Sequence, residues 1–356
     1  MKPQPRIPSE CPQMTAETRK ERLRRILRET LDAQLPLDSN GHRPRMGGPW
    51  ATFFGEQNVW DETTQLDCGL YLDLRSDFDN NTVREILLAA ANIKIARTTL
   101  TKEKIAVLQT IADRHGVRIV VGNGQWILRP DQGKGGWANQ VERAAEPDEP
   151  GAVSNVYIAS DATLAETGQM LDEAGEDDLF GALLGIPACC REAFDKNKSS
   201  AAGRQLDFIP YVLENTPGDP PWDWRLNYPA QYFGYALLSF FPCSFRCPVA
   251  ASVACRTLAM LTQCDAAWAR KFVDLQQTNI LYTESDGLHL LRQPVCDGSI
   301  AYSSKDLLST ESTAIAALLR QGNRLDIAGP HSVHIYKDSA RIASIAGADT
   351  CMCSFW

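Results

Sequence analysis

The sequence predicts an α/β protein: an N-terminal α/β domain, then a helical module that contains cysteines, then a small α+β part at the C-terminus. Helical and strand-like patterns alternate in residues 61–175. Residues 176–275 are rich in aromatic side chains and contain two close pairs of cysteines, and strand-like runs dominate residues 276–356. Residues 1–60 form a proline-rich tail with one expected helix at 15–34. The length of 356 residues is sufficient for two or three such parts.

In the α/β domain, apolar spacing and turn residues define the expected elements. Gly116 ends one helix, and Gly122-Asn123-Gly124 is typical of a tight β-hairpin turn. The expected elements are a strand at 69–74, helices at 81–95 and 101–115, a hairpin of strands 117–121 and 125–128, a strand at 153–159 and a helix at 160–174.

In the rest of the chain, a long helical pattern is followed by two hairpins. We expect a helix at 248–275, paired strands at 279–282 and 288–291, a helix at 310–320, and paired strands at 332–336 and 341–345. The pattern Cys-Met-Cys at 351–353 is predicted to lie in a flexible chain end.

Composition excludes several functional classes. The net charge of −8 argues against non-specific nucleic-acid binding, which needs a concentrated basic surface. We expect no membrane span, because the longest apolar stretch, 232–245, is short and interrupted. The N-terminus lacks the apolar core of a signal peptide, so a cytoplasmic protein is expected. In that compartment the eleven cysteines are core residues, metal ligands or redox groups rather than a disulfide framework.

Two cysteine-containing turns are the strongest functional signal. Residues 185–190 have the sequence Gly-Ile-Pro-Ala-Cys-Cys, and residues 242–248 have the sequence Pro-Cys-Ser-Phe-Arg-Cys-Pro. Proline suits the first turn of a helix, so each motif is expected to begin one. Free amides and the helix dipole favour thiolates at this position. Cys189, Cys190, Cys243 and Cys247 are therefore the predicted metal ligands.

The spacing of these cysteines excludes several common types of metal centre. The Cys-x2-Cys pairs of zinc fingers and ribbons are absent, as are ferredoxin and radical-SAM patterns. Helix N-termini would stabilise a net negative iron–sulfur cluster, which is the expected cofactor, with zinc as the alternative. Two other interpretations remain: a reactive dithiol without metal, and plain packing of the cysteines in the core. Both are considered because adjacent helical residues point about 100° apart, so Cys189 and Cys190 would not easily face the same ion.

The two motifs together resemble an uncharacterised prokaryotic family. Its members combine a Gly-Tyr/Ile-Pro-x-Cys-Cys segment with a later Pro-Cys-Ser segment that ends in cysteine, and the similarity covers roughly residues 150–260. The resemblance implies that the four cysteines act together. It implies no particular reaction.

The leading functional hypothesis is an intracellular, metal-dependent oxidoreductase that performs a reductive or sulfur-related step on a small molecule. Cys190, Arg191 and Arg225 are its candidate catalytic or substrate-anchoring residues, and an electron-donor protein is a possible partner. One alternative is a zinc-stabilised binding or scaffold module. Another is a nucleotide-dependent transferase that uses Asp73 and Asp77, with a purely structural cysteine module.

Overall fold

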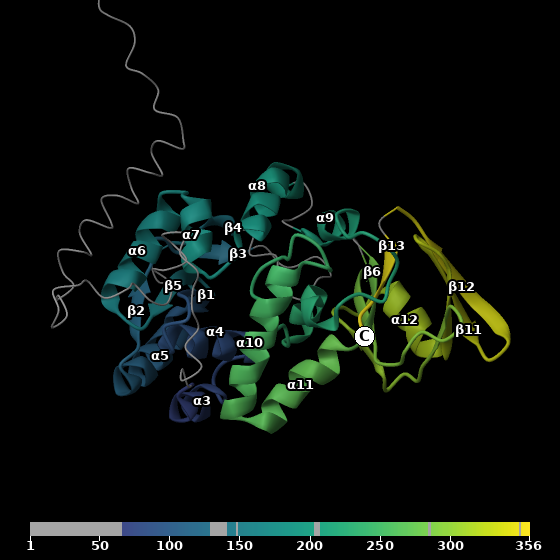
Figure 1. Ribbon diagram of the computed structural model, residues 1–356, viewed down its shortest axis with the longest axis horizontal. Coiled ribbons are helices and arrows are strands. Elements are labelled where there is room, and N and C mark those ends of the chain that lie inside the picture. Colours follow the sequence, from purple (N-terminus) through teal and green to yellow (C-terminus); the bar gives the residue numbers. More distant parts are fainter. Residues whose placement is uncertain (1–65, 129–140, 147–148, 203–206, 284–285, 349) are drawn as a thin grey trace, which may run out of the picture. The chain divides into compact units, whose positions relative to one another are not determined.

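The computed structural model describes residues 66–128, 141–146, 149–202, 207–283, 286–348 and 350–356 (Figure 1). The expected helix at 15–34 lies outside these residues. The described chain contains both helices and antiparallel sheets, which confirms a mixed α/β fold. None of its helices combines the length and the apolar character that crossing a bilayer requires.

The first sheet is built around strand β5. Its strands are β1 (Ala96–Thr101), β2 (Arg118–Val121), β3 (Trp126–Leu128), β4 (Val141–Ala144) and β5 (Val153–Ala159). Strand β5 is antiparallel to β1 on one edge and to β2 and then β3 on the other. The predicted hairpin of β2 and β3 is therefore wrong: the turn at Gly122 joins two strands that both pair with β5 instead of with each other. Helices α4 (Asn80–Ala90), α5 (Lys102–His115) and α6 (Ala162–Glu173) pack against this sheet.

The predicted strand at 69–74 is helix α3 (Cys68–Leu74). Asp67 caps this helix, because its side chain accepts hydrogen bonds from the backbone N–H groups of Gly69 and Leu70. The alternating leucines of this segment suit a strand, yet Leu70 and Leu74 are buried on one helical face while Leu72 is 54% exposed.

The middle of the chain is helical, as predicted. It comprises α7 (Asp177–Leu183), α8 (Ala188–Ala202), α9 (Ile209–Glu214), the 3₁₀ helices η1 (Trp224–Leu226) and η2 (Tyr228–Phe233), α10 (Pro248–Cys264) and α11 (Ala266–Gln276). The single helix expected at 248–275 is divided at Asp265. This residue is extended, and its carboxylate accepts from Ala267 N and Trp268 N, so it caps a new helix.

Two small antiparallel sheets follow. One contains β6 (Asn279–Thr283), β7 (Gly287–Leu291), β9 (Leu307–Ser309) and β13 (Thr350–Ser354); the other contains β8 (Ser299–Ala301), β10 (Arg324–Gly329), β11 (Ser332–Lys337) and β12 (Ala340–Ala346), with α12 (Ala314–Gln321) between β9 and β10 in sequence. Both predicted strand pairings, β6 with β7 and β11 with β12, are confirmed. The predicted flexible end at 351–353 is wrong, since β13 pairs with β6 and Cys353 is fully buried.

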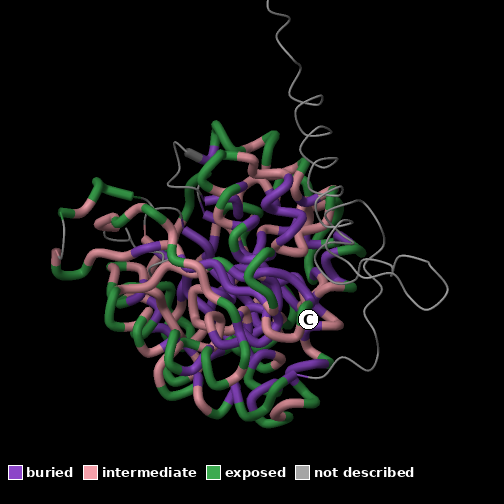
Figure 2. Tube along the Cα trace, turned by 90° about the vertical axis from the view of Figure 1, so that its left-hand side faces the viewer, coloured by how far each residue is buried: buried purple, intermediate pink, exposed green. Residues whose placement is uncertain are grey.

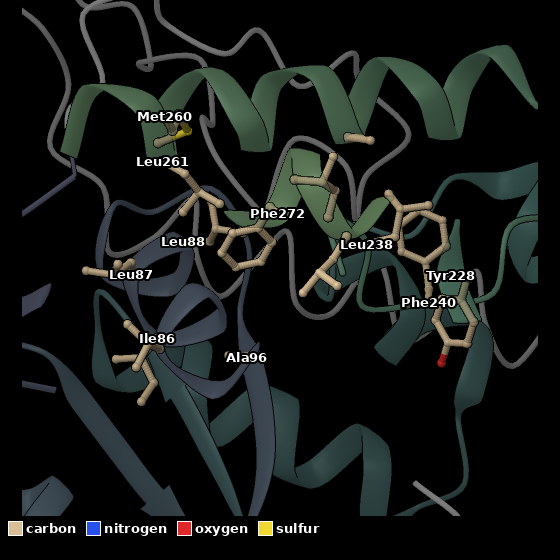
Figure 3. Packing of buried hydrophobic residues seen from close by; sticks show 14 of the residues in the cluster. Ile86, Leu87, Leu88, Ala96, Tyr228, Leu238, Phe240, Met260, Leu261 and Phe272 are labelled. Carbon is tan, nitrogen blue, oxygen red and sulfur yellow. The ribbon is translucent and has the colours of Figure 1, made fainter. Parts of the chain in front are cut away.

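One hydrophobic core joins the first sheet to the helical module. Figure 3 shows Leu87 and Leu88 of α4 close to Leu261 of α10 and Phe272 of α11. The same cluster continues to Tyr282 in β6. Figure 2 colours the buried parts of the chain purple, and they gather in the interior. The segments that carry the cysteine motifs are therefore attached to a common interior.

His289 in β7 makes the stability of this part of the protein sensitive to acid. Its side chain is completely buried, Nδ1 lies 3.0 Å from Ser309 Oγ, and Nε2 has no hydrogen-bond partner. Burial lowers the pKa of His289 to about 4. Because the unfolded chain binds a proton near pH 6.5 and the folded chain does not, the free energy of unfolding should fall by about 3 kcal/mol between pH 6.5 and 4.

The measurement is urea unfolding at pH 7 and at pH 4.5 for the wild type and for His289→Gln. The glutamine variant should lose less stability on acidification, because it has no imidazole to protonate. An equal loss in both proteins would show that His289 is not responsible for the acid sensitivity.

Candidate metal centre

The first cysteine turn lies between α7 and α8. Gly185 has a φ of +73°, a conformation that favours glycine, and lets the chain reverse after α7. Pro187 then precedes α8, and its carbonyl oxygen accepts from Cys190 N at 2.9 Å and from Arg191 N at 3.0 Å. Cys189 and Cys190 are thus in the first turn of the helix, as predicted.

The second cysteine turn leads into α10. Cys247 is the N-cap of this helix, and its Sγ accepts from Ala250 N at 3.5 Å. Phe245 N donates to Thr216 Oγ1 at 2.9 Å, which fastens the turn to the loop after α9. The prediction that this motif begins a helix is confirmed. Thr216 was not anticipated, because nothing local to either motif indicates this contact.

The two turns bring four sulfur atoms together. The Sγ atoms of Cys189, Cys190, Cys243 and Cys247 all lie within 4.8 Å of one another. Cys189 Sγ is 3.9 Å from Cys190 Sγ and 3.8 Å from Cys247 Sγ. This set could hold a metal ion. The expectation that adjacent helical cysteines diverge too far does not hold here, because rotation about each Cα–Cβ bond moves the sulfur atom independently of the backbone.

The sulfurs interact electrostatically. The thiol of Cys190 donates to Cys247, and this hydrogen bond, with the N–H of Ala250, lowers the pKa of Cys247 to about 5. Burial raises the pKa of Cys243 to about 12 and also raises that of Cys189. Four neighbouring thiolates repel one another, so a cation at their centre is what would allow all of them to lose their protons.

A pocket of about 260 Å³ adjoins the cysteine cluster. Cys190 and Arg191 line it, together with an aromatic wall. The aromatic residues of this wall are Phe180, Phe194, Phe208, Tyr228, Phe240 and Phe241. Ser239 also lines the pocket, although no local sequence pattern distinguishes it.

The two arginines proposed as substrate anchors lie in different places. Arg191 lines the pocket, but its Nε donates to Asp178 Oδ1 at 2.8 Å and its Nη1 to the carbonyl oxygen of Ile186 at 2.6 Å. Arg225 is paired with Asp223, and its Nη1 lies 2.8 Å from Cys255 Sγ. It is not among the residues that line the pocket. The catalytic roles of Cys190, Arg191 and Arg225 stay predictions.

The aspartates considered for a nucleotide-dependent reaction have structural partners. Asp77 Oδ2 accepts a hydrogen bond from Ser76 Oγ at 3.0 Å. Asp73 Oδ2 lies 2.9 Å from His115 Nε2. Within the described part of the chain, the cysteine cluster is the only group of three or more His, Cys, Asp or Glu side chains with the geometry of a metal site.

Compared with known protein families, with curated proteins and with solved structures, this chain has no match. Its function must therefore be argued from the cysteine cluster and the adjoining pocket.

Proposed function

We propose that Cys189, Cys190, Cys243 and Cys247 bind a single metal ion, zinc or iron, in a closed tetrahedral site. Four sulfurs at a metal–sulfur distance of about 2.3 Å and at tetrahedral angles lie about 3.8 Å apart. The distances of 3.8 and 3.9 Å from Cys189 Sγ to two of the other sulfurs support this geometry, and the limit of 4.8 Å for all pairs agrees with it. In a four-iron cluster each thiolate binds a different iron atom, which spreads the sulfurs further.

A site with four protein ligands leaves no coordination position for a substrate, so the proposed role of the ion is structural. It joins the first turns of α8 and α10, which are distant in sequence: Cys189 and Cys247 are 58 residues apart. Because Cys190 also lines the pocket, the ion fixes one wall of it. The proposed function is therefore binding of a small molecule in a pocket that a metal centre holds in shape.

The second candidate is the iron–sulfur oxidoreductase with an electron-donor protein as its partner. The observation that favours it is the same position of Cys190, since a small molecule in the pocket would be adjacent to the centre. Arg191 would then face the substrate from the same wall. In this hypothesis one thiolate ligand can be replaced by the substrate, and the centre passes electrons from the donor protein to that substrate.

Anaerobic purification followed by analysis of zinc, iron and acid-labile sulfide separates the two candidates. We expect one metal ion per chain and no sulfide, and we expect cobalt exchange to give the charge-transfer absorption of four thiolates. Iron with equimolar sulfide would favour the oxidoreductase. A metal-free protein that does not bind cobalt would contradict both.

A further inference from the structure

A buried group of three charged residues contacts Ser239, which lines the pocket, and includes none of the cysteines. The side chains of Arg84, Glu85 and Lys94 are 2%, 13% and 8% exposed. Arg84 Nη2 is 3.0 Å from Glu85 Oε1, and Lys94 Nζ forms an ion pair with Glu85 Oε2. Burial of ions is expensive unless they are paired, and here two cations share one carboxylate. Groups of this kind occur at functional sites and also in structural ion-pair networks, and the contact with a pocket distinguishes the two.

Ser239 connects this group to the pocket. Its Oγ lies 2.7 Å from Lys94 Nζ, and the half-buried side chain of Ser239 lines the pocket beside Phe240 and Phe241. A hydroxyl that faces a pocket, an amine at hydrogen-bond distance from it and a carboxylate that orients the amine are the three parts of an activated nucleophile.

We infer that Ser239 is the nucleophile of an acyl-transfer site, with Lys94 as its general base and Glu85 as the residue that positions Lys94. The substrates are small esters or amides with an aromatic acyl group. This activity goes beyond the proposed binding function and uses none of the four cysteines.

Lys94 can act as a base because the group has two cations, Arg84 and Lys94, but only one carboxylate, that of Glu85. A guanidinium does not lose its proton in proteins, so Lys94 is the cation of this group that can become neutral. Burial lowers the pKa of Lys94, and Arg84 lowers it further, while Glu85 opposes this shift. These two residues of α4 are the charged groups that act on Lys94; on other sides it contacts Ser239 and is close to Gly185. Neutral Lys94 accepts the proton of Ser239, and Glu85 then stabilises the ammonium ion.

The reaction is balanced without a redox partner. Ser239 Oγ forms a bond to the carbonyl carbon while its proton moves to Lys94 Nζ. The bond to the leaving alcohol or amine then breaks, and the leaving group takes the proton from Lys94. Water attacks the acyl-serine and gives one proton to Lys94; Ser239 Oγ recovers this proton as the acid is released.

The pocket indicates the size and nature of the substrate. Its volume of about 260 Å³ is below the usual range for drug-sized ligands, so it suits one ring with a short substituent. Phe208 stacks on Phe194 with a centroid distance of 4.7 Å, and Phe241 lies 4.8 Å from Phe208. An aromatic acyl group would extend this set of ring contacts.

The test uses the metal-replete full-length protein, a fluorophosphonate probe and the 4-nitrophenyl esters of acetate and benzoate. We expect covalent labelling at Ser239, located by peptide mass spectrometry, and faster hydrolysis of the benzoate ester. Ser239→Ala should lose labelling and reduce hydrolysis at least 100-fold. Ser332→Ala is the matched control, because Ser332 is half-buried in β11 and does not line this pocket. Absence of label on Ser239 in folded protein, or equal hydrolysis by Ser239→Ala, would overturn the assignment.

Two further variants test the base and its positioning residue. Lys94→Arg retains the charge but cannot accept the proton, so labelling should fall about 100-fold with the metal content unchanged. Glu85→Gln removes the anion that stabilises the ammonium ion, so the pH midpoint of labelling should move to lower pH. A purely structural role of Glu85 would change the melting temperature but leave this midpoint in place. Wild-type protein that is labelled at Ser239 but binds neither zinc, iron nor cobalt would disprove the proposed centre and leave the acyl-transfer site standing.

Discussion

Replacing Cys243 by serine is expected to release the metal ion and to reduce the free energy of unfolding by about 3–5 kcal/mol, because loss of a structural metal belongs to the most destabilising changes. Cys243 is only partly buried, so the smaller hydroxyl itself causes little packing loss. The proposed ion would join chain segments from two helix starts, and without it the sulfur atoms would have only weak mutual hydrogen bonds. Urea unfolding with metal analysis of the same samples measures both effects.

Cys264→Ser is the matched control for this prediction. Cys264 is also partly buried but lies at the other end of α10, outside the cluster. It should keep its metal and stay within about 1 kcal/mol of the wild type. A chelator should destabilise the wild type to the level of Cys243→Ser and leave that variant unchanged. Similar stability of the two serine variants would contradict a structural metal centre.

Local chemistry explains which parts of the fold the sequence could predict. Pro187 and Cys247 mark helix starts through proline and N-cap preferences, which depend on a few neighbouring residues. The left-handed Gly116 ends α5 for the same reason. The prediction that the two cysteine pairs lie close together was also correct. It was based on the position of both pairs at expected helix starts, because their spacing matches no standard metal-binding motif.

The wrong predictions concern elements that distant contacts decide. The leucines of α3 fit a strand as well as a helix, and contacts far along the chain favour the helix, such as that of Tyr71 with Trp268, whose rings are 4.7 Å apart. Strand β13 forms because Cys351 pairs with Tyr282 of β6, far away in sequence. No local pattern carries this information.

The pocket could not be predicted for the same reason. Glu85 belongs to an amphipathic helix and would ordinarily be assigned to its solvent face. Glu85 is buried because it pairs with Lys94, which follows α4. Lys94 in turn contacts Ser239 of the helical module, 145 residues further along the chain. Three unremarkable positions become a candidate catalytic group only in the folded chain.

Replacing Phe245 by alanine is expected to destabilise the protein by about 3–5 kcal/mol, the usual cost of removing a buried phenyl ring. Phe245 is fully buried and lies between Cys243 and Cys247 in the sequence. Its ring stacks on Trp222 with centroids 5.3 Å apart and meets the edge of Phe355 at 5.0 Å. The cavity left by the ring would loosen the turn that presents Cys243 and Cys247, so metal affinity should fall as well. Urea unfolding and competition with a chromophoric chelator measure the two effects.

Val249→Ala on the first turn of α10 is the control, since Val249 is 50% exposed and its loss should stay below about 1 kcal/mol. Repeating the unfolding measurements after chelation tests whether the contacts of Phe245 and the proposed ion stabilise the cysteine turn together. If Phe245 acts partly by holding the cysteine turn, its replacement should be less damaging after chelation than before, because the ion no longer contributes in either protein. An equal loss with and without metal would mean that the aromatic contacts stabilise the core independently of the cysteine cluster.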